Sequence, residues 1–286
     1  MHRLDARSIE GEMSVHDKID LAAAQHGLAG TRFAAGVTHF GTIGSTNTEL
    51  MRAAGEGAPE GTVYVADEQT AGRGRGGHQW HSEPGYGLYV SALVRPKLKP
   101  DDGLLLSLAA GIAVQQAIEQ TCGLTLDIRW PNDLMLTVEH DGGTRKCGGI
   151  LVESAIQPGE QPTMRHAVIG IGLNVHHSAF PAELKMLATS LRLNTCEPLH
   201  RTSLLIALLR ALDREVTMLE REPASHRGLL HRFTMASSWV LGKRVSVPED
   251  GGYTGTTSGL DARGYLQVAG DDGVDRTVRS GGVRAL

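Results

Sequence analysis

The sequence predicts an α+β fold made of a larger α+β domain and a small β-domain. Between residues 38 and 237, short β-branched segments alternate with longer segments of helical apolar periodicity, the pattern of strands and amphipathic helices. From Ser238 onward the chain holds only short strand-like segments separated by Gly and Asp, as in a small β-barrel. We therefore expect a domain boundary near residue 237.

Local patterns predict the elements of the larger domain. A T-x-x-E capping box, Thr46 and Glu49, predicts a helix that begins after the turn at 41–45. Short apolar runs with β-branched residues predict strands at 62–69, 88–96, 126–137 (interrupted by a proline), 146–154 and 166–175. Periodic segments predict helices at about 101–121, 182–190, 202–222 and 224–236.

The charge balance and the cysteine content exclude several classes of protein. With 28 Lys and Arg against 32 Asp and Glu, the net charge is −4, which argues against a general nucleic-acid coat. The small β-domain is itself balanced, with six residues of each sign, so we do not expect it to bind nucleic acid. Cys122, Cys147 and Cys196 lie far apart and form no CxxC pair, which favours reduced thiols in a cytoplasm.

Hydropathy gives no sign of secretion or membrane insertion. The first twenty residues lack the apolar core of a signal peptide. The apolar run at 104–114 is too short to span a bilayer. We therefore expect neither export nor a membrane partner.

Glycine is in excess, and one glycine-rich run predicts a binding loop. Glycine accounts for 36 of the 286 residues, about 13% against a usual share of roughly 7%. In GRGRGG (72–77), Arg73 and Arg75 alternate with glycines, which let a backbone approach a ligand closely. Arginine donors suit carboxylate and phosphate oxygens. The run therefore predicts an anion-binding loop, and a flexible Arg-Gly loop remains the alternative. Neither a P-loop nor a dinucleotide fingerprint is present.

Two later segments place polar groups at strand ends. RWPNDLM (129–135) contains Asn132 and Asp133 directly after a proline that interrupts strand pairing. RKCGGILVES (145–154) contains Lys146, a point charge suited to a carboxylate or phosphate, just before two glycines. Taken singly, each segment is also compatible with an ordinary turn or with a hairpin carrying a surface lysine.

Two further segments offer hydrogen-bonding groups. In GIGLNV (170–175), two glycines on an apolar strand permit close backbone contact, and Asn174 is the isolated polar group. Ser45 and Thr46 stand at a helix start, where they could bind a small polar ligand or only cap the helix. No His or Cys cluster has the spacing of metal ligands, so we expect no protein-held metal ion.

The order of these segments is more specific than any one of them, and together they resemble the biotin protein ligase family. The segments that carry the resemblance are STNTEL (45–50), DEQTAGRGRGGHQW (67–80), RWPNDLML (129–136), RKCGGILVE (145–153) and GIGLNV (170–175). With the small β-domain, the likeness covers residues 38–286. It implies a class II aminoacyl-tRNA-synthetase-like catalytic domain, a mixed sheet flanked by helices, and a C-terminal SH3-like β-barrel. The expected domains are an N-terminal extension (1–37), a catalytic biotin- and ATP-binding domain (38–237) and the SH3-like domain (238–286).

The resemblance also implies a two-step reaction, that of a biotin–[biotin carboxyl carrier protein] ligase. Biotin and Mg-ATP would first give biotinyl-5′-AMP and pyrophosphate. The activated carboxyl would then acylate one lysine of a biotin carboxyl carrier protein, that of acetyl-CoA carboxylase or a related biotin-dependent enzyme. Mg²⁺ is expected to arrive with ATP. We expect a cytoplasmic enzyme that binds no DNA, and a homodimer is compatible with the sequence.

Roles for individual residues follow from the same resemblance. Lys146 and Arg73 would neutralise the biotin carboxylate and the α-phosphate, and Asp133 would orient or deprotonate the acceptor lysine. The Gly-Arg loop would close over the adenylate, with Trp80 as an apolar lid near the adenine. The expected biotin-binding residues are Ser45, Thr46, Asn47, Gln69, Gly72, Arg73, Lys146 and Gly149. The expected adenylate- and ATP-binding residues are Arg75, Trp80, Arg129, Asn132 and Asn174.

Two departures and three rival functions qualify the resemblance. Arg129 stands where the family usually has lysine, and a planar guanidinium is not a point charge. Only 44 residues precede Ser45, so we do not expect the winged helix-turn-helix of the repressor members. The rivals are a lipoate-protein ligase of the same fold, a biotin-sensing transcriptional regulator and a non-catalytic binding protein with a decayed ligase fold. Retention of the catalytic lysine, arginine and aspartate argues against decay.

Overall fold

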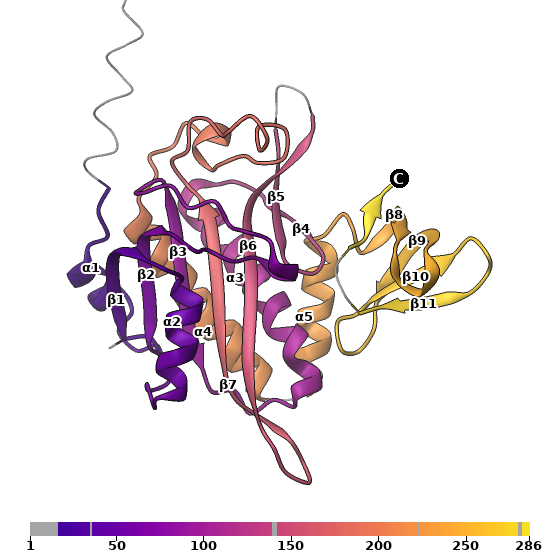
Figure 1. Ribbon diagram of the computed structural model, residues 1–286, viewed down its shortest axis with the longest axis horizontal. Helices are drawn as coiled ribbons and strands as arrows, with labels where there is room; N and C mark the ends of the chain where they lie inside the picture. The colour runs from indigo at the N-terminus through magenta and orange to yellow at the C-terminus, as the bar shows by residue number, and fades with distance from the viewer. Residues whose placement is uncertain (1–16, 35, 139–141, 222, 280–281) are drawn as a thin grey trace, which may run out of the picture.

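The computed structural model describes residues 17–34, 36–138, 142–221, 223–279 and 282–286, and two β-sheets organise it (Figure 1). A seven-stranded sheet has the order β1-β2-β3-β7-β6-β5-β4, and a five-stranded sheet has the order β11-β10-β9-β8-β12. The helices accompany the larger sheet, and the smaller sheet lies at the C-terminal end of the molecule. The predicted α+β class is confirmed, whereas closure of the smaller sheet into a barrel stays a prediction.

The larger sheet is mixed. β1 runs parallel to β2, and the remaining neighbours are antiparallel. β3 is buried along its whole length, as expected for a central strand covered on both faces. The strands are β1 (Val37–Ile43), β2 (Val63–Gln69), β3 (Gly87–Val94), β4 (Asp127–Arg129), β5 (Asp133–Thr137), β6 (Thr144–Gln157) and β7 (Thr163–Asn174).

Helices cover both faces of this sheet. Successive residues of a strand point to opposite faces. Leu93 of β3 and Val168 of β7 accordingly pack with Leu50 and Ala54 of α2, whereas the alternate residues join the main core beneath α3 and α4. The α-helices are α1 (Leu21–Gly27), α2 (Thr46–Gly55), α3 (Gly103–Cys122), α4 (Arg201–Arg221) and α5 (Pro223–Met235). The 3₁₀ turns are η1 (Arg75–Gly77), η2 (Pro100–Asp102), η3 (Arg192–Asn194) and η4 (Glu249–Gly251). Among the described residues, no helix has the length and apolar character needed to cross a membrane.

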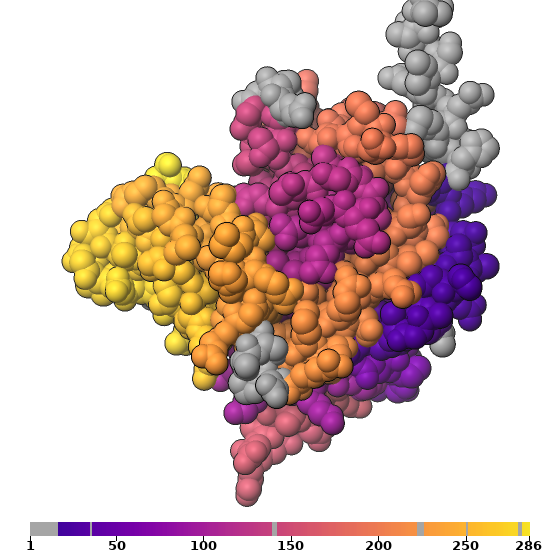
Figure 2. Space-filling model, turned by 180° about the vertical axis from the view of Figure 1, so that it is seen from behind, coloured from indigo at the N-terminus to yellow at the C-terminus, as the bar shows by residue number. Residues whose placement is uncertain are grey.

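The five-stranded sheet packs against the larger part of the molecule. Figure 2 shows it projecting from one side, and in Figure 1 the helix next to it is α5. Trp130 Nε1 donates a hydrogen bond of 2.9 Å to the Gly264 carbonyl, and Arg129 Nη2 donates one of 2.6 Å to the Val283 carbonyl. The buried apolar residues of this sheet join the main core. Its strands are β8 (Leu241–Val247), β9 (Tyr253–Leu260), β10 (Leu266–Gly270), β11 (Asp275–Val278) and β12 (Arg284–Ala285).

Two local predictions were wrong. The segment 182–190 forms turns and an isolated bridge in place of the predicted helix. Its backbone bonds to Lys146 instead, with Lys146 N donating to the Leu187 carbonyl at 2.9 Å. The cap of α2 is Ser45, whose Oγ accepts from Thr48 N at 3.4 Å, because the Thr46 hydroxyl is engaged in the interior. Residues 1–16 and 35 of the predicted extension at 1–37 lie outside the described residues.

Candidate active site

The candidate active site consists of two adjoining cavities over the larger sheet. The smaller has an empty volume of about 480 Å³, and the larger one of about 1840 Å³. The residues that line both are Gly74, Arg75, Trp80, Asn132 and Lys146. A ligand with two chemically different parts could therefore lie across this shared boundary.

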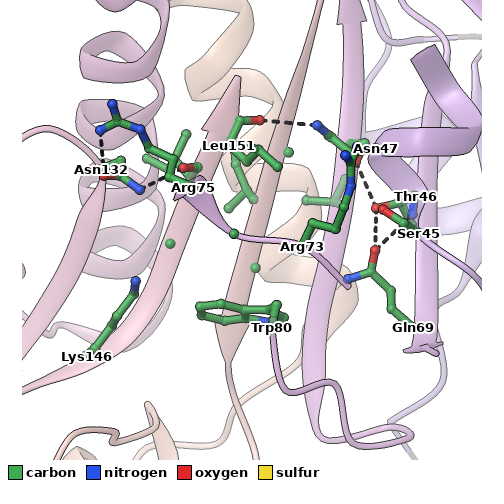
Figure 3. Close-up of a pocket in the computed structure, with 18 residues that line it drawn as sticks. Ser45, Thr46, Asn47, Gln69, Arg73, Arg75, Trp80, Asn132, Lys146 and Leu151 are labelled. Carbon is green, nitrogen blue, oxygen red and sulfur yellow. Dashed lines mark hydrogen bonds between the residues drawn. The ribbon is translucent and has the colours of Figure 1, made fainter. Parts of the chain in front are cut away.

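The smaller cavity brings together segments that are distant in the sequence. In Figure 3, Ser45, Thr46, Asn47 and Gln69 group on one side and Lys146, Asn132 and Arg75 on the other, with Arg73 and Trp80 between them. The start of α2, the end of β2, the loop after β2, and strands β3, β6 and β7 all contribute. The predicted residues that line this cavity are Ser45, Thr46, Asn47, Gln69, Arg73, Arg75, Trp80, Asn132, Lys146 and Gly149.

A chain of hydrogen bonds sets the polar side of the smaller cavity. Gln69 Oε1 accepts from the backbone N of Thr46 at 2.9 Å and from its hydroxyl at 3.0 Å. The buried Ser91 hydroxyl lies 2.8 Å from Thr46 Oγ1 and 2.9 Å from Asn47 Oδ1. Buried polar groups are costly unless they are paired, so these contacts hold the side chains in one arrangement.

Glycines on β6 and β7 make room for two side chains. Gly149 and Gly172 face each other across the strands. A Cβ added to Gly172 would lie 2.8 Å from Trp80 Cε2, and one added to Gly149 would lie 3.3 Å from Trp80 Cζ3. A Cβ on Gly170 would lie 2.4 Å from Asn47 Oδ1. The close backbone contact expected of GIGLNV is thus present, and its partners are protein side chains.

The cationic groups at the site each have an acceptor. Lys146 Nζ lies 2.5 Å from Asp133 Oδ1 and 5.6 Å from the Trp80 ring centroid. Arg75 Nη1 donates to Asn132 Oδ1 at 3.2 Å, and burial lowers the pKa of Arg75 below its usual value. A cation held near an apolar ring and partly desolvated interacts strongly with an anion.

Three predicted site residues line only the larger cavity, and the two of them that were expected on the nucleotide side are held by protein partners. Asp133, Arg129 and Asn174 lie there. The Arg129 guanidinium bonds to the Val283 carbonyl and stacks 4.1 Å from the centroid of the Trp239 ring. Asn174 Nδ2 donates to the Thr189 carbonyl at 3.0 Å. Their predicted contacts with ATP stay predictions.

Gly72 lines neither cavity, and it supports the loop instead. A Cβ at this position would lie 3.0 Å from the Trp80 carbonyl oxygen and 3.2 Å from Gln69 Nε2. Gly72 and Trp80 are also joined by a backbone hydrogen bond of 2.9 Å. The glycine therefore permits the turn that carries Trp80 into the site.

Several lining or supporting residues were missed by the sequence analysis. Ser91 is the one small polar side chain in the apolar strand GLYVSALV, a signal that points to it from the sequence. Glu153, a carboxylate on the same strand as Lys146, accepts hydrogen bonds from Arg73 and Asn47. The apolar wall of the larger cavity contains Phe180, Leu184, Leu187 and Ala188. Leu184, Leu187 and Ala188 belong to the segment 182–190 that was predicted as a helix, and no sequence signal linked them to the site.

The comparisons with known proteins agree with this arrangement. Residues 41–174 match the Biotin/lipoate A/B protein ligase family, and residues 240–283 match the Biotin protein ligase C terminal domain. The chain is 34% identical over 239 residues to the bifunctional ligase/repressor BirA of Bacillus spizizenii, covering 82% of this chain and 69% of that protein. It is 35% identical over 231 residues to the biotin–[acetyl-CoA-carboxylase] ligase of Mycobacterium tuberculosis, covering 78% and 79% of the two chains.

A solved structure resembles most of this architecture. The biotin protein ligase from Aquifex aeolicus in complex with biotin and ATP superposes with a TM-score of 0.71 at 26% identity. The superposition covers 88% of this chain and 100% of that one. Because sequence identity and fold agree across both sheets, the chain belongs to the biotin protein ligase family.

Proposed function

We propose that this protein activates biotin with ATP to biotinyl-5′-AMP and then transfers the biotinyl group to one lysine of a biotin carboxyl carrier protein. The observation that carries the proposal is the position of Lys146 at the boundary shared by the two cavities. Biotin has a polar ureido ring, an aliphatic chain and a terminal carboxylate. The smaller cavity offers amide and hydroxyl groups for the ring, and Lys146 would meet the carboxylate.

Adenylation would take place at this boundary. A carboxylate oxygen of biotin attacks the α-phosphorus of ATP, the bond to the β-phosphate oxygen breaks, and pyrophosphate leaves. Two anions must approach each other for this step. Lys146 and Arg73, both lining the smaller cavity, would offset their repulsion and the charge that develops at phosphorus. Arg75 and Trp80 would then cover the adenylate and exclude water, which protects a mixed anhydride from hydrolysis.

Transfer would use the pair formed by Lys146 and Asp133. The acceptor amine attacks the carbonyl carbon of the anhydride, AMP leaves, and the amine loses a proton. Once bound anions engage Lys146, the Asp133 carboxylate is available to orient the amine or to accept that proton. The ammonium and the carboxylate would thus serve successive steps.

Mg²⁺ would enter as part of the Mg-ATP substrate. Among the described residues, no group of three or more His, Cys, Asp or Glu side chains is placed to hold a metal ion. Mg²⁺ commonly binds substrate phosphates with few protein carboxylates. Asp133 is the carboxylate among the described residues that line the larger cavity.

The remaining partners are part of the same proposal. The acceptor would be the carrier domain of acetyl-CoA carboxylase or a related enzyme, the former being named in the relative from Mycobacterium tuberculosis. Cys122, Cys147 and Cys196 are free thiols, which fits a reducing cytoplasm. The net charge of −4 favours function without DNA binding. Light scattering with and without biotinyl-AMP tests whether the protein forms a homodimer.

Mass spectrometry of a carrier domain tests the proposed activity and its nearest rival. The protein, ATP and Mg²⁺ are incubated with the carrier domain and either biotin or lipoate. We expect one biotinyl group on one lysine and no mass gain with lipoate. A carrier modified by lipoate and not by biotin would overturn the proposal in favour of a lipoate-protein ligase.

A further inference from the structure

Glu153 on β6 accepts hydrogen bonds from two sides of the smaller cavity. Its Oε2 accepts from Asn47 Nδ2 at 2.7 Å. The same carboxylate accepts from Arg73 Nη2, at 2.9 Å to Oε2 and 3.0 Å to Oε1. One carboxylate therefore joins the first turn of α2 to the Gly-Arg loop.

The strand places Glu153 in line with residues of the site. Side chains two apart on a strand share a face, and Gly149 and Leu151 on β6 both line the smaller cavity. Glu153 continues this row at the edge of the cavity, with 29% of its side chain exposed. Arg73 is 48% exposed, so packing contributes little to its orientation and its recorded ion pair is with Glu153.

The geometry leaves part of the arginine free for a substrate. Among the hydrogen bonds recorded for the described residues, Arg73 uses Nη2 with Glu153. A guanidinium is a rigid plane with donors on several edges. A carboxylate that holds Nη2 fixes the plane and leaves the hydrogens on Nε and on Nη1 available to a second anion.

Asn47 extends the effect of Glu153 toward the polar side of the cavity. An asparagine amide has a donor and an acceptor end, and the bond from Nδ2 to Glu153 decides which end faces Ser91. Oδ1 then lies 2.9 Å from the Ser91 hydroxyl, which also contacts Thr46. The carboxylate thus orders groups on both sides of the cavity.

We propose that Glu153 is a positioning residue that holds Arg73 over the biotin carboxylate and sets the orientation of the Asn47 amide. This role rests on the proposed biotin-activating function and adds to it a residue that touches neither substrate. Loss of the charge at Glu153 releases the Arg73 side chain and loosens the Gly-Arg loop. Biotin then binds more weakly and biotinyl-AMP escapes faster, while the other charged groups of the reaction stay in place.

The test uses Glu153→Gln in the full-length protein. Glutamine keeps the shape and an acceptor for Asn47 but removes the charge that binds Arg73. The matched control is Glu68→Gln, on β2, where the carboxylate accepts from Thr42 Oγ1 at 2.8 Å away from both cavities. Biotin-dependent ATP–pyrophosphate exchange gives kcat and KM, and release of labelled biotinyl-AMP gives its residence time.

We expect Glu153→Gln to raise KM for biotin and to shorten the residence time of biotinyl-AMP, each by roughly tenfold, because charge-assisted hydrogen bonds exceed neutral ones. We expect kcat at saturating biotin to change by less than about threefold. Amide hydrogen exchange in residues 70–80 should accelerate. In an Arg73→Ala background, Glu153→Gln should add little, because the two residues act as a unit.

Any of four other outcomes would contradict the proposal. Tighter biotin binding by Glu153→Gln would mean that Glu153 competes with biotin for Arg73. An equal effect in the Arg73→Ala background would mean that Glu153 acts elsewhere. If the wild-type protein shows biotin-dependent exchange and Glu153→Gln has the same kinetics, the positioning role is refuted and the proposed function stands. A wild-type protein without such exchange would overturn the proposed function and the positioning role together.

Discussion

The Lys146 ammonium lies 2.5 Å from the Asp133 carboxylate, across the neighbouring strands β6 and β5. Each side chain is about one-third exposed, so solvent reaches the pair and a ligand can separate it. A mobile cation with a ready counter-ion can exchange that partner for incoming anions. We therefore expect loss of Lys146 and loss of Asp133 to affect different half-reactions.

Removal of the lysine should stop the first half-reaction. In Lys146→Ala the two anionic reactants lose the cation that lies between them, so biotin-dependent ATP–pyrophosphate exchange should fall by at least about 100-fold. The matched control is Lys97→Ala, at an exposed position outside both cavities. Normal pyrophosphate release by Lys146→Ala would remove the lysine from its assigned role.

Neutralisation of the aspartate should slow the second half-reaction. Asp133→Asn keeps a hydrogen-bonding side chain but cannot accept the proton of the acceptor amine. Pyrophosphate exchange should stay within about threefold, and single-turnover transfer to the carrier should fall by about 10²–10⁴. Asp275→Asn, at an exposed position on β11, is the control. Equal slowing of both half-reactions would mean that Asp133 acts only through Lys146.

A methyl group under the indole should loosen the lid. Gly172→Ala places a Cβ 2.8 Å from Trp80 Cε2, and overpacking of this kind costs about 1–3 kcal/mol. We expect biotinyl-AMP to dissociate roughly tenfold faster, because Trp80 is displaced from the site. Gly159→Ala is the control, since a Cβ there meets nothing within 4 Å. If Gly172→Ala retained biotinyl-AMP for as long as wild type does, Trp80 would have no role as a lid.

Arg129 should stabilise the contact between the two sheets. Arg129→Ala loses the hydrogen bond to Val283 and the stacking on Trp239, and hydrogen bonds to charged groups contribute about 1.5–3 kcal/mol. We expect a lower urea midpoint and faster amide exchange at 282–286. Arg263→Ala is the control, because the ion pair of Arg263 with Asp101 joins the turn between β9 and β10 to η2 but is exposed and should contribute little. If Arg129→Ala instead raised KM for ATP and left stability unchanged, the arginine would be a phosphate ligand.

Acid should destabilise the protein through His177. Burial first, and then His81 and His176, lower the pKa of His177 to about 4 from 6.5. Neither ring nitrogen has a hydrogen-bond partner among the described residues, and the ring stacks 5.1 Å from Phe180. The unfolded chain binds the His177 proton more tightly than the folded protein does. The stability that depends on neutral His177 is therefore complete above about pH 6.5 and is lost as pH falls toward 4.

Urea unfolding at several pH values measures this effect. The free energy of unfolding should fall by on the order of 3 kcal/mol across that window through His177. His177→Phe keeps an aromatic ring and should flatten the pH dependence. His231→Phe, at an exposed position of α5, should leave it unchanged. A pH profile shared by His177→Phe and wild type would assign the acid lability to other groups.

Much of the site could be predicted because many of its reactive side chains lie within short sequence motifs. Local patterns of glycine, proline and charge indicate Arg73, Lys146 and Asn132, and all three line the smaller cavity. No local pattern indicates what Ser91 or Glu153 does, because the role of a single polar residue in an apolar strand depends on the residues that lie across from it. Their partners are 44 and 80 residues away along the chain.

The sequence by itself determined the class of fold, the order of the strands and helices along the chain, and the identity of the reactive side chains. Periodicity, capping and glycine runs act over a few residues, so they can be read from the chain alone. Tertiary structure decided which groups pair. It set Lys146 against Asp133, drew Arg129 to Val283, and kept 182–190 from forming a helix by pairing it with the edge of β6. These outcomes depend on long-range packing, which overrides local propensity wherever a segment gains more from a distant partner than from its own turns.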